Sequence, residues 1–85
     1  MNAETTQQEI LNLLSDKDLK TQLEILANVF IVLGARGIRV PGSEYLSKDN
    51  IVDIALKDKR ENGETIHNAL VFQGLTLHLW LENMN

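Results

Sequence analysis

The sequence predicts an α+β fold, in which two N-terminal helices pack on one face of a three-stranded antiparallel β-meander. Three observations lead to this prediction. The apolar residues of the first 33 positions recur with a period near 3.6, which is typical of helices. Leucines at 75, 77, 79 and 81 instead alternate with Thr76, His78 and Trp80, a period of two that is typical of a strand. The pairs Asn62-Gly63 and Gln73-Gly74 are suited to the tight turns that join antiparallel strands.

The first helix is expected to begin at one of two threonines and to end at Ser15. Thr5 is followed three residues later by Gln8, and Thr6 by Glu9, so either threonine could form a capping box. The same Ser15 is a suitable N-cap for the second helix. We therefore expect two helices joined by almost no loop.

The second helix is expected to be the most buried element. Its predicted core stripe consists of Leu19, Leu23, Leu26, Phe30 and Leu33, and Ile25, Val29 and Val32 are expected to widen it. These positions follow a helical period, so they share one face. Gly34 is placed to end the helix in a left-handed conformation, and Arg36 would interact favourably with the negative end of the helix dipole.

The last third is expected to form strands near 51–59, 65–73 and 75–82, and residues 38–40 could add a fourth strand at the edge. The registers agree only if the hairpin at Asn62-Gly63 contains a one-residue bulge. An all-α fold of four helices is the alternative. In that fold Ser47 caps a helix that runs to Glu61, Gly63 ends it, and a final helix covers 65–83. Its support is that Ile66, Leu70, Leu77 and Leu81 also fit helical spacing.

Length and composition predict one small domain over residues 1–85. The chain has no Cys and a net charge of −4. A core of this size is marginal without disulfides or metals, so oligomerisation is expected to supply further burial. The N-terminus lacks the pattern of a secretory signal, and no apolar stretch is long enough to cross a bilayer. We therefore expect a cytoplasmic protein without membrane partners.

Enzymatic, metal and nucleic-acid functions are poorly supported. The serines at 15, 43 and 47 are better explained as caps or turn residues than as nucleophiles. Two histidines without a nearby third ligand do not make a zinc site. Twelve acidic residues outnumber eight basic ones, so no continuous positive stripe is expected for a phosphate backbone. We expect no enzyme activity, no cofactor and no nucleic-acid partner.

A protein-interaction surface is the remaining possibility. One face of the predicted sheet would present the residues Trp80, His78, Val71, His67, Ala69 and Thr76. This mixture of aromatic, small and weakly polar residues suits the centre of a protein interface. The sequence therefore predicts a non-enzymatic interaction or regulatory module that forms a homodimer through Trp80. A small acidic inhibitor protein is one form of such a module.

The alternative function is the binding of a small anionic ligand. Arg36 and Arg39 lie in a glycine-rich stretch, with Tyr45 a few residues further on. The glycine spacing matches neither the P-loop nor the dinucleotide-binding fingerprint. The sequence thus leaves a weak anion contact at the two arginines as a second hypothesis.

Overall fold

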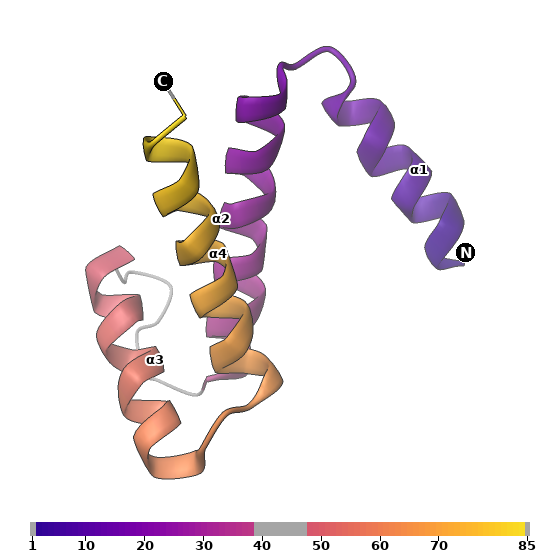
Figure 1. The fold of residues 1–85 in the computed structure, drawn as a ribbon. Helices are drawn as coiled ribbons and strands as arrows, with labels where there is room; N and C mark the ends of the chain where they lie inside the picture. Colours follow the sequence, from indigo (N-terminus) through magenta and orange to yellow (C-terminus); the bar gives the residue numbers. More distant parts are fainter. Residues whose placement is uncertain (1, 39–47, 85) are drawn as a thin grey trace.

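The structure is a computed structural model that describes residues 2–38 and 48–84. Within these ranges the chain forms helices α1 (Ala3–Leu14), α2 (Leu19–Gly37), α3 (Lys48–Asn62) and α4 (Ile66–Glu82), and no strand. Helices α2 and α4 lie antiparallel side by side, α3 packs against α4, and α1 projects from the opposite side of α2 (Figure 1). The predicted α+β fold and its meander are therefore wrong, and the all-α alternative is confirmed. Residues 39 and 40 of the expected edge strand, and the Ser47 cap, lie outside the described residues.

Local signals around Gly63 explain why residues 48–82 are helical. Gly63 has a φ of 74°, a left-handed conformation that ends α3 without the steric cost of a side chain. Two residues later, Thr65 opens α4 with a complete capping box to Asn68. A helix scatters the alternating leucines around its axis: Leu81 is 3% exposed, whereas Leu79 is 60% exposed. The helix signals at Gly63 and Thr65 therefore determine the structure of this region, despite the strand-like alternation of leucines from 75 to 81.

The side chain of Asn68 ties α4 to the end of α3. Its Nδ2 donates to Asp58 Oδ2 at 2.8 Å and to the Gly63 carbonyl oxygen at 2.9 Å. Its Oδ1 accepts from the Thr65 backbone N–H at 3.1 Å. Asn68 is fully buried, and these bonds satisfy it. The α3–α4 turn is thus fixed by one amide.

The first two helices exist as predicted and Ser15 ends α1, but the N-caps differ from the predicted ones. Asn2 caps α1 and Asp18 caps α2, each accepting from the backbone N–H three residues later. Ser15 lies in the corner between the helices and donates from Oγ to the Asn12 carbonyl oxygen at 2.7 Å. Gly34 does not end α2, which continues to Gly37.

Gly34 instead belongs to a close seam between α2 and α4. A methyl group added to Gly34 would lie 2.5 Å from the His67 carbonyl oxygen and 2.9 Å from the Val71 backbone nitrogen. A methyl group added to Gly74 would lie 2.6 Å from the Ala27 carbonyl oxygen. Small residues on both helices therefore let the two backbones approach closely. Ala27, Ile31 and Val71, which contact these two glycines, are also buried.

A second cluster of apolar residues joins α3 to this pair. Ile38, Ala55 and Val71 form its buried centre. Four partly buried residues pack around them: Ile51, Ile54, Phe72 and Leu75. The Lys59 ammonium lies 5.7 Å from the centroid of the Phe72 ring, within the range of a cation–π contact. The core is thus made by α2, α3 and α4 without the body of α1.

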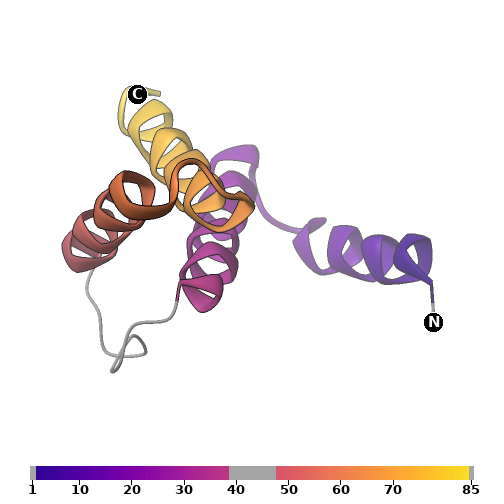
Figure 2. The ribbon, with the colours of Figure 1, turned by 90° about the horizontal axis from the view of Figure 1, so that it is seen from below.

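Helix α1 stands apart from the other three helices (Figures 1 and 2). The Cα radius of gyration is 14.3 Å, whereas about 11.9 Å is expected of a compact chain of 85 residues. The molecule is accordingly broad and thin, with principal extents of 40 × 38 × 23 Å. Only Leu14 at the end of α1 is buried.

Candidate protein-interaction surface

The structure does not gather the six predicted interface residues on one face, because the strand alternation that grouped them is absent. Trp80 is 72% exposed on α4, and Thr76, one turn before it, is also exposed. Val71 is fully buried against α2, nine residues before Trp80 and therefore half a turn around the helix. Ala69 is half-buried. The Trp80 side of α4 thus remains an exposed surface, but Val71 belongs to the core.

The two histidines do not meet. They lie eleven residues apart on α4, which separates them by about 16 Å along the axis. The His67 ring lies beside Gly37, at the end of α2. The His78 Nε2 is 2.8 Å from Asn28 Oδ1, a hydrogen bond between α4 and α2 in which a protonated Nε2 donates. Each histidine therefore contacts α2 at a different level.

Exposed apolar side chains gather on α1 and on the side of α2 that faces away from α4. On α1, Ile10 is 46% exposed, Leu11 49% and Leu13 74%. On α2, Val29, Val32 and Leu33 are between 43% and 47% exposed. Scattered exposed apolar residues are ordinary, whereas several on one part of the surface make that part a candidate for protein binding.

The concave side of this surface is a groove of about 370 Å³, which we call the α1–α2 groove. Its described lining consists of Ala3, Thr6, Gln7, Ile10, Leu11, Leu14 and Leu26. The α1 residues follow a spacing of three and four, so they form one face of that helix. Leu26 is the α2 residue of the lining. The groove is therefore the apolar inner side of the angle between α1 and α2.

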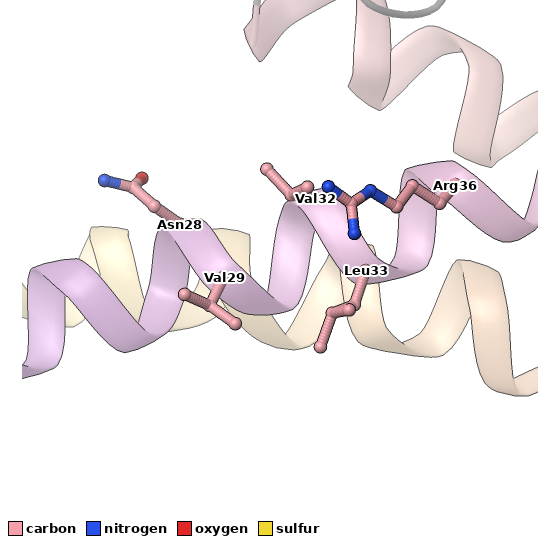
Figure 3. A pocket seen from close by; sticks show the side chains of 5 residues that line it. All are labelled: Asn28, Val29, Val32, Leu33 and Arg36. Carbon is pink, nitrogen blue, oxygen red and sulfur yellow. The ribbon is translucent and has the colours of Figure 1, made fainter. Parts of the chain in front are cut away.

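A second, shallow groove of about 280 Å³ continues this surface along α2. Its described lining is Asn28, Val29, Val32, Leu33 and Arg36, which we call the outer face of α2 (Figure 3). In Figure 3, Val29 and Leu33 project together, and Asn28, Val32 and Arg36 follow the neighbouring edge. Leu26, Val29 and Leu33 are three and four residues apart, so the α2 residues of both linings lie on one face of the helix. Arg39 and Tyr45, which the sequence places with Arg36 in a possible anion-binding site, lie outside the described residues.

Hydrogen bonds around Gln22 hold the corner between α1 and α2. Its Nε2 donates to the Leu14 carbonyl oxygen at 3.0 Å and to the Lys17 carbonyl oxygen at 2.8 Å. The Asp18 carboxylate accepts from the Thr21 backbone N–H at 2.8 Å. Its hydrogen bonds with the Thr21 side chain and backbone lower the pKa of Asp18, because they favour the charged carboxylate. The corner is thus a structured connection rather than a loose linker.

The sequence prediction treated the first helix as covered by the rest of the fold, and so missed Ile10, Leu11 and Leu13 as a candidate surface. A signal was present, because apolar residues at 10, 11, 13 and 14 are distributed too widely for one helix contact to cover.

Among residues 2–38 and 48–84, no helix is both long and apolar enough to span a membrane. No group of three His, Asp or Glu side chains in the described part of the chain could hold a metal ion. Comparisons of the chain with protein-family models, curated proteins and solved structures gave no match.

Proposed function

We propose that this chain is a non-enzymatic protein-interaction module that acts as a homodimer. The observation that carries the proposal is the exposed apolar surface of α1 and the outer face of α2. Hydrophobic side chains at 43–74% exposure on two adjacent helices lose their contact with water when a partner covers them.

The isolation of α1 supports a partner. The helix has 12 residues and only its last residue, Leu14, is buried. Isolated helices of about this length are marginal in water, because most helix stability in proteins comes from packing of the apolar face. A second copy would provide that packing.

The accessible area of the chain supports the same proposal. The folded chain exposes 6382 Å², whereas about 5,100 Å² is expected of a monomer of 9.6 kDa. The excess is about 1,300 Å², and a standard protein interface buries about 800 Å² on each partner. The chain therefore exposes enough extra surface for one stable interface.

Sedimentation equilibrium tests the proposal directly. We expect a dimer at tens of micromolar chain that dissociates on dilution, with the helical circular dichroism signal retained. A mass that stays that of one chain over the whole concentration range would contradict the proposal.

A second candidate function is the binding of a small amphipathic anion at Arg36. The outer face of α2 combines this guanidinium with three aliphatic side chains and the Asn28 amide around about 280 Å³, close to the lower limit of ligand sites. Thermal unfolding against a panel of carboxylated and phosphorylated metabolites tests it. A ligand that raises the melting temperature of the original chain and not that of Arg36→Ala would support this function.

A further inference from the structure

We infer that the two copies exchange their first helices, with α1 of each copy lying on the outer face of α2 of the other. This inference rests on the proposed function, since it requires self-association, and it names the surface through which the copies associate.

The dimensions of the two surfaces match. A helix of 12 residues is about 18 Å long, and the outer face of α2 from Asn28 to Arg36 extends over about 12 Å. The outer face of α2 and the last five residues of α1 are mainly aliphatic. One copy of α1 therefore covers the length of one outer face of α2.

The apolar face of α1 is wider than its own contact with α2 can cover. Leu14 is buried at the corner between α1 and α2, whereas the side chain of the adjacent residue, Leu13, is 74% exposed. Ile10 lies between them on the helix surface and is 46% exposed. Leu13 and the exposed part of Ile10 are thus available to a second molecule.

The corner keeps α1 from covering the outer face of its own α2. Gln22 bonds the carbonyl oxygens of Leu14 and Lys17, and Lys17 N–H donates to the Leu14 carbonyl oxygen at 3.0 Å. These bonds connect the end of α1 to the beginning of α2 over a short connection. Folding α1 back onto Val29 and Leu33 would break them, so cover from a second copy is favoured.

The charges of the two surfaces are complementary. Helix α1 carries Glu4 and Glu9 and no basic residue. The charged residue of the outer face of α2 is Arg36, which has no carboxylate within ion-pair distance among the described residues. Glu9 is four residues before Leu13 and lies about 40° from it around the helix, so it would reach the rim of a contact made by Leu13 and Ile10, whereas Glu4 lies on the opposite side of α1.

Reciprocal exchange makes the interface two-fold symmetric. In such an interface every contact between α1 and the outer face of α2 occurs twice, so the area buried and the effect of any substitution are both doubled. The exchange also closes the assembly at two copies, because both complementary surfaces are used.

Charge-reversal variants test the exchange. Arg36→Glu alone opposes carboxylates in both contacts, and Glu9→Arg alone opposes cations. We expect each variant to dimerise at least about fivefold more weakly than the original chain. An equal mixture of the two variants restores opposite charges in both contacts, and it is expected to form a heterodimer with nearly the original affinity. This rescue is specific to a reciprocal contact between the two surfaces.

Leu13→Asp tests the apolar part of the contact, and Trp80→Asp is its matched control. Both positions are exposed, at 74% and 72%, so both variants should fold, as circular dichroism would verify. Leu13→Asp is expected to weaken the dimer at least about tenfold, and Trp80→Asp to leave it within about twofold.

The possible outcomes separate the two proposals. A dimer that Leu13→Asp leaves intact, or that the charge variants weaken without rescue in the mixture, would overturn the exchange of α1 and leave the homodimer standing. A dimer lost in Trp80→Asp would likewise move the interface to α4. A chain that is monomeric throughout would overturn the homodimer and the exchange with it.

Discussion

Gly34→Ala tests whether the close seam between α2 and α4 holds the fold together. In an ordinary exposed helix the change would stabilise the protein by about 1 kcal/mol, because glycine is a poor helix former. Here the new methyl group would lie 2.5 Å from the His67 carbonyl oxygen, 2.7 Å from Val71 Cγ2 and 2.9 Å from the Val71 nitrogen. Two of these atoms are backbone, so no side-chain rotation relieves the overlap and α2 must move away from α4.

The magnitude follows from the two opposing contributions. Overpacking of a close contact costs about 1–3 kcal/mol, and backbone contacts place this site at the upper end. After subtraction of the helix-propensity gain of about 1 kcal/mol, we expect a net loss of about 2 kcal/mol. For a chain of this size that loss corresponds to a decrease in melting temperature of about 8–16 °C.

Gly37→Ala provides the matched control on the same helix. Its methyl group would meet the imidazole ring of His67, a side chain that is exposed and can rotate away. We expect this variant to be neutral or stabilised by up to about 1 kcal/mol. The stability of both variants is measured by urea and thermal unfolding, followed by circular dichroism at 222 nm. All samples have the same chain concentration, because dimerisation adds to the apparent stability. A Gly34→Ala variant as stable as Gly37→Ala would refute the close seam.

Four further predictions concern the turn between α3 and α4 and the exposed tryptophan. Asn68→Ala removes the partners of the Thr65 backbone N–H and the Gly63 carbonyl oxygen, in hydrogen bonds that are only partly buried, and should cost about 1–3 kcal/mol in urea unfolding; a loss below about 1 kcal/mol would show that water replaces the amide. The hydrogen bonds from Asn68 and then Asn62 lower the pKa of Asp58. As the pH falls, Asp58 therefore takes up its proton at a higher pH in the unfolded chain than in the folded chain. The free energy of unfolding should accordingly decrease below about pH 4, and it should decrease less steeply in Asn68→Ala, which lacks one of these hydrogen bonds. Thr65→Ala should cost about 1 kcal/mol through loss of the N-cap, whereas Thr76→Ala, which loses only an exposed bond to its own helix, should stay within about 0.5 kcal/mol. Trp80, the only tryptophan, should be quenched by iodide equally in the monomer and in the dimer, and protection in the dimer would place the interface on α4.

The sequence allowed the helical first half to be predicted, but not its core face. Leu19 and Leu33 of the predicted stripe are 61% and 47% exposed, and the buried residues are Ala27, Ile31 and Gly34. A stripe chosen by hydrophobicity favours leucines, whereas close approach of two helices favours small residues. The buried face of α2 is set by its contact with Gly74 on α4, and these residues are far apart in the sequence, so the pattern within α2 alone does not reveal it.

The second half shows the limit of periodicity in a helix that is apolar nearly all round. Leucines at alternating positions fit a strand and a helix equally well when most positions are apolar. The sequence from Gly63 to Asn68 contains the decisive signals, a left-handed glycine followed by a threonine with a capping partner three residues later. The sequence shows that α1 is amphipathic. It does not show that the apolar side of α1 is exposed, because this depends on the angle between α1 and α2, which the hydrogen bonds of Gln22 hold.

The hydrogen bond between Asn28 and His78 joins residues 50 positions apart, whereas that between Asp58 and Asn68 spans only 10. Closing a longer loop costs more chain entropy, and folding slows as contacts become less local. The α3–α4 hairpin should accordingly form early in folding, with α2 docking along Gly34 and Gly74 in the slow step. Substitutions in the hairpin would then mainly slow folding, and those in the seam would mainly speed unfolding.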